Sequence, residues 1–233
     1  MGLQWFVALD QQLLHSMNGS DSLFLDGMMR TISSGYTWIP LYLALLYIVI
    51  RNNENMNQIM LIIGCSAICL VLSEGVADGI AKPLVERLRP TYDPMIRGSV
   101  DIVDGITGPQ PYGFFSAHAA NTFGIALLFI LIVRSRILSV TLVIWSLLNG
   151  YSRIYLGVHY PGDVICGLLW GSVSAIIAYI VYWRVHRKIA SPDNYISSQY
   201  TNTGYSFADI DIVQSIFAFT MLYVMIRSLI YCY

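Results

Sequence analysis

Residues 152–163, SRIYLGVHYPGD, place an arginine, a histidine and an aspartate at the edge of very apolar sequence. A carboxylate beside one ring nitrogen of a histidine fixes the tautomer and supports a positive ring, which leaves the other nitrogen able to attack or to move protons. We therefore expect His159 to do chemistry, with Asp163 as its partner and Arg153 as a nearby cation. A structural His–Asp contact at a helix start is the alternative, but it leaves Arg153 unexplained.

A second block, KPLVERLRP, covers residues 82–90. Lys82 and Arg89 are seven residues apart, about two helical turns, so we expect them on one face of a helix that ends near Pro90. The arginine fork suits phosphate and the lysine adds a point charge, so the pair predicts an anion site. Two cations snorkelling to a membrane interface are the alternative and, for this block alone, the more common case.

A third block, FFSAH, covers residues 114–118. Ser116 precedes a long apolar run and is a candidate N-cap. The N-terminus of a helix offers N–H groups and a positive dipole end, which favour anions. His118 falls in the first turn of this expected helix. By itself, the block fits a capped helix with an interfacial histidine equally well.

Together the three blocks predict phosphoryl chemistry. Three cations can neutralise a phosphoryl group and stabilise the charge of its transition state. One histidine can act as nucleophile and the other as general acid. No Asp/Glu cluster with metal-ligand spacing accompanies them in the sequence, so we expect a mechanism without metal or other cofactor.

The elements that carry these blocks are expected to be membrane helices. The chain is 56% hydrophobic and 12% charged, whereas soluble domains carry about 25% charged residues. A spanning helix needs about 20 mostly apolar residues. The uncharged runs are 31–50, 55–73, 119–133, 137–152, 164–183 and 212–226. We therefore expect an all-α integral membrane protein with about six transmembrane helices in a bundle, the third starting near Tyr112.

The remaining segments complete one membrane domain. Residues 1–30 alternate apolar and polar positions and predict short amphipathic helices at the membrane interface. The expected parts of the single domain 1–233 are these interfacial helices, a catalytic helical core 31–190 with an outer loop 83–112, a polar cytoplasmic linker 191–209 and an extra C-terminal transmembrane helix 210–233.

The basic residues predict the orientation. Six lie on the side of connections 51–54, 134–136 and 184–211, and six lie on the side of the three blocks. On the side of the three blocks, Lys82, Arg89 and Arg153 are assigned to the site. Without them, six basic residues remain on the side of the connections and three on the side of the blocks. Since cytoplasmic loops carry the excess of Lys and Arg, we expect the site on the outer face, in a bacterial cytoplasmic membrane the periplasmic face.

Acidic residues recur on the second expected span. Glu74, Asp78, Lys82 and Glu86 are spaced by four residues. Because i,i+4 positions are neighbours on a helix, Asp78 could hold Lys82 in position, with Glu74 as further support. The alternative is that both acids simply lie at the outer interface.

The three blocks, in this order, resemble the signature of the type 2 phosphatidic acid phosphatase superfamily and of the related vanadium haloperoxidases. That signature reads Lys-x6-Arg-Pro, then Pro-Ser-Gly-His, then Ser-Arg-x5-His-x3-Asp. The chain matches it from Lys82 to Asp163 in order and spacing. It departs at Phe115, where the family has Pro, and at Ala117, where it has Gly.

The resemblance implies a role for each residue. His159 would be the nucleophile that takes the phosphoryl group, Asp163 would orient it, and His118 would be the general acid. The implied phosphate-binding groups are Lys82, Arg89, Ser116, Arg153 and a backbone N–H near Ala117. Alanine keeps that N–H but loses the freedom to take positive φ, so the geometry of this loop is the open point.

The resemblance also implies the activity: removal of a phosphate from a membrane lipid through a phosphohistidine. The implied substrates are undecaprenyl diphosphate or another polyprenyl diphosphate, lipid A, phosphatidylglycerophosphate and phosphatidate, and nothing in the sequence separates them. Small dolichyl diphosphatases of the endoplasmic reticulum are similar too. A lipid phosphotransferase and a catalytically silent lipid-binding or transport protein are the alternatives. The net charge of −1 gives no indication of nucleic-acid binding, and the oligomeric state stays open.

Overall fold

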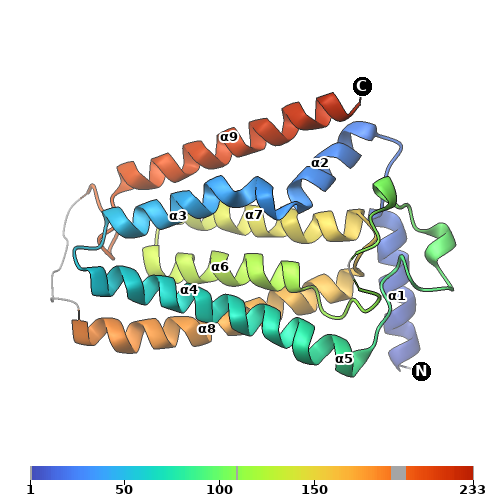
Figure 1. The fold of residues 1–233 in the computed structure, drawn as a ribbon, viewed down its shortest axis with the longest axis horizontal. Coiled ribbons are helices and arrows are strands. Elements are labelled where there is room, and N and C mark those ends of the chain that lie inside the picture. The colour runs from blue at the N-terminus through green and yellow to red at the C-terminus, as the bar shows by residue number, and fades with distance from the viewer. Residues whose placement is uncertain (1, 109, 190–197, 233) are drawn as a thin grey trace.

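The protein is a bundle of long helices capped at one end by a shorter one. The computed structural model describes residues 2–108, 110–189 and 198–232, with side chains described from residue 5 onward. Five helices run along the bundle: α3 (Ile39–Arg51), α4 (Met56–Val76), α6 (Ala117–Val133), α7 (Arg136–Tyr155) and α8 (Pro161–Ile189). The helix α1 (Gly2–Met17) crosses one end of the bundle, while α2 (Leu23–Ser33) and α9 (Phe207–Tyr231) lie along one side (Figure 1).

Short helical turns connect these helices. A 3-10 turn η1 (Gly35–Trp38) joins α2 to α3, a π-helical turn η2 (Ala77–Ala81) joins α4 to the four-residue α5 (Lys82–Val85), and η3 (Arg97–Ser99) and η4 (Val103–Gly105) lie in the loop that follows. No β-strand occurs within the described ranges, where only two isolated bridges are found. The expectation of an all-helical membrane bundle is confirmed.

Four stretches are long and apolar enough to cross a membrane. They are Met56–Val85, Arg136–Tyr155, Pro161–Ile189 and Phe207–Tyr231. The bent pair Leu23–Ser33 and Gly35–Arg51, with 69° between its parts, adds a fifth. The helix α6 is apolar but has only 17 residues and begins at Ala117, not near Tyr112. The number of six spans therefore stays a prediction.

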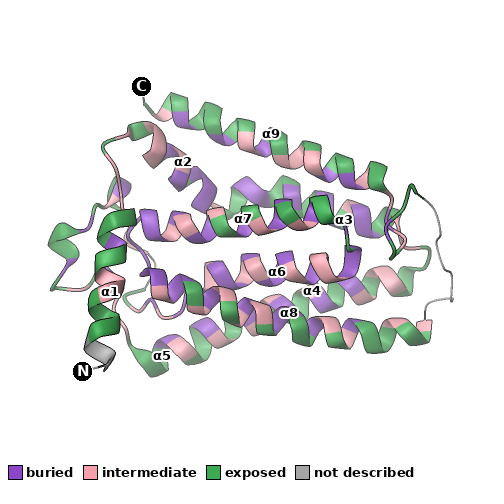
Figure 2. Ribbon diagram, turned by 180° about the vertical axis from the view of Figure 1, so that it is seen from behind, coloured by how far each residue is buried: buried purple, intermediate pink, exposed green. Residues whose placement is uncertain are grey.

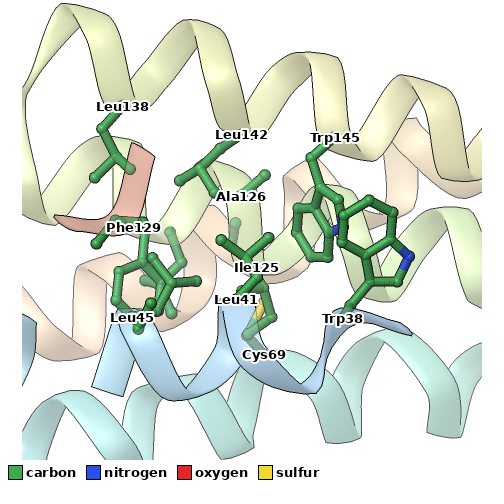
Figure 3. Packing of buried hydrophobic residues seen from close by; sticks show 14 of the residues in the cluster. Trp38, Leu41, Leu45, Cys69, Ile125, Ala126, Phe129, Leu138, Leu142 and Trp145 are labelled. Carbon is green, nitrogen blue, oxygen red and sulfur yellow. The ribbon is translucent and has the colours of Figure 1, made fainter. Parts of the chain in front are cut away.

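Tryptophans fill the middle of the bundle. Trp38 of η1 and Trp145 of α7 are fully buried, with ring centroids 5.9 Å apart in an edge-on arrangement (Figure 3). Leu41 and Ile125 lie beside them in the same apolar cluster. Both α8 and α9 carry exposed segments, green in Figure 2. Many of their exposed residues are apolar, such as Leu169 and Phe219, and such faces suit lipid.

The two ends of the bundle carry the two groups of connections expected from the sequence. The loop 86–116 and the turn 156–160 lie at the end covered by α1, and the connections after α3, α6 and α8 lie at the other end (Figure 1). Two helices, α1 and α2, occupy the segment before residue 31 where short helices were expected, although α2 continues to Ser33.

The C-terminal part differs from the expected polar linker. Residues 190–197 lie outside the described residues, and α9 begins at Phe207, so 207–209 belong to the helix. Between them the chain packs against the bundle: the Thr203 hydroxyl donates to the carbonyl of Val133, 2.8 Å away, and the N–H of Ser206 donates to the Asn52 side chain, 2.7 Å away. Side-chain and backbone hydrogen bonds thus fasten a segment that its composition suggested was solvated.

Candidate active site

His159 lies in the turn between α7 and α8. Gly157 takes a φ of 66°, which an L side chain rarely adopts, and lets the chain reverse tightly after Tyr155. Pro161 opens α8 and places Asp163 in its first turn, as the sequence predicted. One Asp163 oxygen accepts from the N–H of Tyr160 at 3.1 Å and lies 3.6 Å from Nδ1 of His159. The carboxylate therefore faces Nδ1 of the ring, while Nε2 faces away from Asp163.

Arg89 does not share a helix face with Lys82, and this prediction is wrong. The helix α5 ends at Val85 because Glu86 takes a left-handed φ of 49°. The following residues pair with residues 111–113 instead of continuing the helix: the N–H of Arg89 donates to the carbonyl of Pro111, 2.8 Å away. Pro90 disfavours helical backbone at Arg89 as well. The outer loop thus runs from residue 86 to residue 116, not from 83 to 112.

The extended backbone carries the Arg89 side chain to His159. Its Nη1 lies 2.9 Å from Nε2 of His159 and donates to the carbonyl of Val158 at 3.0 Å. Its Nε donates to the carbonyl of Gln110 at 2.7 Å. The guanidinium is buried and fixed by three contacts. An anion bound by Arg89 would therefore lie next to the histidine nitrogen that faces away from Asp163.

Lys82 comes from a different element at the same end. It follows the π-turn η2, and π-turns are frequent at functional sites. Its side chain is buried and its ammonium pairs with Asp78, so the expected i,i+4 pair is present. Glu74 accepts from the amide of Asn121 at 3.4 Å and thereby contacts α6.

Ser116 caps α6 as predicted. Its hydroxyl accepts from the N–H of Ala119 at 3.3 Å, and its own N–H donates to the carbonyl of Asp163 at 3.0 Å. This close contact between α6 and α8 is possible because Gly167 has no side chain; a Cβ there would lie 3.1 Å from that of Ala119. Ala117 and His118 form the first turn of α6, where N–H groups have no partner within the helix.

Arg153 lies in the last turn of α7 and is partly buried, with its Nη1 donating to the hydroxyl of Ser33. Its Nε has no hydrogen-bond partner within the described part of the chain. A buried guanidinium nitrogen with an unused donor suits an anion that is not a protein group.

The charges of several predicted site residues act on His159. Burial lowers the pKa of His159 well below its usual value, and the charges of Arg89, Arg153, Lys82 and His118 lower it further. The ring is therefore neutral at physiological pH, which leaves a lone pair on one nitrogen.

Three contacts at this site were missed by the sequence analysis. Arg87 donates to Asp163 at 2.8 Å and to Asp10 of α1 at 2.6 Å. Gly113 lies next to Asp163 and His159: a Cβ at residue 113 would lie 3.3 Å from Asp163 and 3.5 Å from Nδ1 of His159. Arg87 could have been found only by treating residues 87–89 as extended, since alternate residues of an extended segment share one side.

Comparison with known proteins shows the family of the chain. Residues 60–187 match the sequence model of the PAP2 superfamily. The chain belongs to the PAP2 superfamily. The match includes every residue from Lys82 to Asp163 that the three blocks singled out.

Curated relatives of this PAP2 protein are lipid phosphatases. The lipid A 4'-phosphatase of Bacteroides thetaiotaomicron is 33% identical over 190 residues, which cover 81% of this chain and 84% of that protein. The lipid A 4'-phosphatase of Porphyromonas gingivalis is 30% identical, covering 77% and 75%. An undecaprenyl-diphosphatase of Sulfolobus acidocaldarius is also 30% identical, covering 71% and 75%. The chain is thus a member of a family of membrane lipid phosphatases.

Two solved structures share the fold. Aquifex aeolicus LpxE aligns with a TM-score of 0.54 at 24% identity and covers 74% of this chain and 95% of its own. The PAP2 type phosphatidylglycerolphosphate phosphatase of Bacillus subtilis aligns with a TM-score of 0.55 at 18% identity, covering 82% and 90%. Both likenesses show that this chain has the same helical fold. Its four helical stretches that are long and apolar enough to cross a membrane support an integral membrane protein.

Proposed function

We propose that this PAP2 protein hydrolyses a phosphate from a membrane lipid through a phosphohistidine on His159, without a metal ion. The observation that supports this most is the contact between Nη1 of Arg89 and Nε2 of His159 at 2.9 Å. It puts a phosphate-binding cation beside a neutral ring nitrogen, while Asp163 faces the other nitrogen.

In the first step, the lone pair on Nε2 of His159 attacks phosphorus, and the bond from phosphorus to the lipid oxygen breaks. His118 enters this step protonated and donates its proton to that leaving oxygen. The phosphorylated ring becomes positive, and the Asp163 carboxylate balances this charge from the Nδ1 side. Each product of this step therefore has a group that stabilises it.

In the second step, a water molecule attacks the phosphohistidine, and the bond from phosphorus to nitrogen breaks. His118, now neutral, accepts the proton of the water and is ready to act as an acid again. Inorganic phosphate leaves and His159 returns to its neutral form. A net hydrolysis results, with no oxidant, reductant or metal needed for balance.

The cations and the start of α6 bind the three non-bridging oxygens. The positive charges of Arg89, Arg153 and Lys82 all act at His159 in a buried site, where charge is effective because water does not screen it. Ser116 and the N–H of Ala117 add hydrogen bonds at the positive end of the α6 dipole. Ala117 takes ordinary helical backbone there, so its N–H suffices without a glycine.

Lipid A is the substrate that we propose first. The two lipid A 4'-phosphatases match the chain over about four fifths of its length. The undecaprenyl-diphosphatase relative makes a polyprenyl diphosphate the second candidate. Phosphatidylglycerophosphate and phosphatidate remain part of the test.

We propose that the protein resides in a bacterial cytoplasmic membrane with the site facing the periplasm. The end that carries His159 has the fewer basic residues once the site cations are set aside. The opposite end has Arg134, Arg136, Arg184, Arg187 and Lys188, as cytoplasmic loops do.

The test is phosphate release by the full chain in detergent with a chelator present, using lipid A, undecaprenyl diphosphate, phosphatidylglycerophosphate and phosphatidate. We expect preference for lipid A and a phosphoenzyme that acid destroys and base preserves. His159→Ala should fold, lack the phosphoenzyme and release no phosphate. Phosphate release by this variant, or a strict requirement for added magnesium, would contradict the proposal.

The same assay separates the two alternatives. A phosphotransferase would form the phosphohistidine but pass the group to an added alcohol faster than to water. A silent lipid-binding protein would form no phosphoenzyme with any of the four lipids.

A further inference from the structure

The helix α1 reaches the catalytic histidine through a chain of ion pairs. Asp10 accepts from Nη2 of Arg87 at 2.6 Å, and Nη1 of Arg87 donates to Asp163 at 2.8 Å. The second oxygen of Asp163 lies 3.6 Å from Nδ1 of His159. Two acids, a forked arginine and the proposed nucleophile thus follow one another in space, although α1 begins the chain.

Asp10 also holds the start of α8. Its Oδ1 accepts from the N–H of Gly162 at 2.7 Å, so its two oxygens bind Arg87 and the backbone next to Asp163. This approach requires glycine: a Cβ at residue 162 would lie 2.8 Å from an Asp10 oxygen. Asp163 is therefore restrained both through its side chain and through its backbone.

Arg87 is fixed from a third side. Its guanidinium carbon lies 3.9 Å above the ring of Tyr160, whose hydroxyl donates to Asp93 at 3.0 Å. The planar fork of arginine can bind one carboxylate at each nitrogen while its face stacks on a ring, which a lysine cannot do. Burial lowers the pKa of Arg87, but the charges of Asp163 and Asp10 outweigh this and raise it overall. The guanidinium stays charged between the two acids.

Asp163 and His159 do not form a tight hydrogen bond by themselves. The 3.6 Å separation is beyond hydrogen-bond range, and Nδ1 of His159 has no other partner within the described residues. The position of the ring thus depends on how firmly Asp163 is held. Arg87 and the N–H of Tyr160 donate to its carboxylate, and the N–H of Ser116 donates to its carbonyl. Asp10 binds the N–H of Gly162, the residue before Asp163.

We infer that Asp10 of α1 is a positioning residue for phosphoryl transfer, acting through Arg87 and Gly162 on Asp163 and so on His159. This inference rests on the proposed function, in which His159 is the nucleophile. Asp10 does not contact the phosphate-binding cations Lys82, Arg89 and Arg153 in the described structure, so it should affect the chemical step and not phosphate binding.

The first test compares Asp10→Asn with wild type in detergent. Because a small displacement of a reacting group costs about one order of magnitude or more, we expect kcat and the rate of phosphoenzyme formation to fall about tenfold. KM and inhibition by inorganic phosphate should change less than about twofold. Asp10→Glu should recover part of kcat, because its carboxylate can still reach Arg87.

The matched control is Asp21→Asn. Asp21 lies at the same end of the molecule, is exposed and makes no ion pair within the described residues. The Asp21→Asn substitution removes the same charge as Asp10→Asn but leaves the contacts of Arg87 intact, so kcat should stay at the wild-type value. An equal loss in both variants would show a general charge effect and overturn the inference.

A double-mutant cycle tests whether Asp10 acts through Arg87. If it does, Asp10→Asn combined with Arg87→Gln should lower kcat no further than Arg87→Gln alone. Independent, multiplying losses would overturn the relay. A wild-type kcat in Asp10→Asn would also overturn it, whereas an active His159→Ala would remove the proposed function itself, so the two failures are distinguishable.

Discussion

Nη1 of Arg89 lies 2.9 Å from Nε2 of His159, and the same guanidinium is anchored to two backbone carbonyls. The carbonyls belong to Gln110 of the outer loop and to Val158 of the turn between α7 and α8. The arginine therefore joins the outer loop to the turn that carries the proposed nucleophile. Its shape matters as much as its charge.

Replacing Arg89 by lysine should therefore be costly. Lysine keeps the charge but cannot bind two carbonyls and a phosphate in fixed directions. We expect kcat/KM to fall about a hundredfold, as for other losses of a preorganised donor at a transition state. Arg97→Lys is the control, since Arg97 lies in the same loop, is exposed and forms no ion pair within the described part of the chain. Equal activities of the two variants would argue against a directional role for Arg89.

The pH dependence should reflect a neutral His159. Burial is the main cause that lowers its pKa, so the unprotonated ring persists below the usual value of 6.5. The acidic limb of kcat/KM, which reports the free enzyme, should therefore lie below pH 6.5. A pH profile measured in detergent checks this. An acidic limb at or above pH 7 would contradict the neutral nucleophile.

The same shift predicts a dependence of stability on pH. Between the lowered pKa of native His159 and the usual value of 6.5, the unfolded chain binds more protons than the folded one. The free energy of unfolding should thus rise with pH in this window and level off above it. His159→Gln should reduce this rise, and thermal melting of both proteins at pH 5 and pH 7.5 measures the difference. A variant that keeps the whole rise would assign it to other groups.

Gly113 should tolerate no side chain. A Cβ there would lie 3.0 Å from Arg89 and 3.3 Å from Asp163, so Gly113→Ala must push these groups apart. Because a displacement of about 1 Å can cost about a hundredfold in rate, we expect kcat to fall between about tenfold and about a hundredfold. Gly98→Ala is the control in the same loop, since no atom lies within 4 Å of its added Cβ. Unchanged activity of Gly113→Ala would mean that the loop can move away without effect on the site.

Asp78 should act through Lys82. The pair joins a buried ammonium to a partly exposed carboxylate. Exposed pairs contribute up to about 1 kcal/mol, so Asp78→Asn should raise KM about fivefold with little change in kcat. Glu86→Gln provides the comparison, because Glu86 is also four residues from Lys82 but forms no ion pair within the described ranges. Similar KM values for the two variants would contradict a role for Asp78 in phosphate binding.

Local features of the site could be predicted from the sequence. Ser116 caps α6, Pro161 opens α8 and Arg153 lies in the last turn of α7, as expected. Capping, the fixed φ of proline and the end of an apolar run depend on a few neighbouring residues. Such features need no knowledge of the rest of the fold.

The placement of Arg89 could not be predicted in this way. A spacing of seven suggested a helix, but residues 87–89 pair with residues 111–113 and the helix ends at Val85. The hydrogen bonds of an extended pair come from a segment more than twenty residues away along the chain. Tertiary pairing therefore overrode the local pattern.

The sequence by itself determined the class of the protein, its PAP2 motif and the chemical groups available to it, because apolar composition and motif spacing can be read along the chain. Only the tertiary structure decided which groups meet. Asp10 reaches Arg87 across 77 residues and Arg87 reaches Asp163 across 76. These contacts depend on how α1 and the outer loop pack against the start of α8, and hydrogen bonds between such distant residues leave no local pattern from which they could be read.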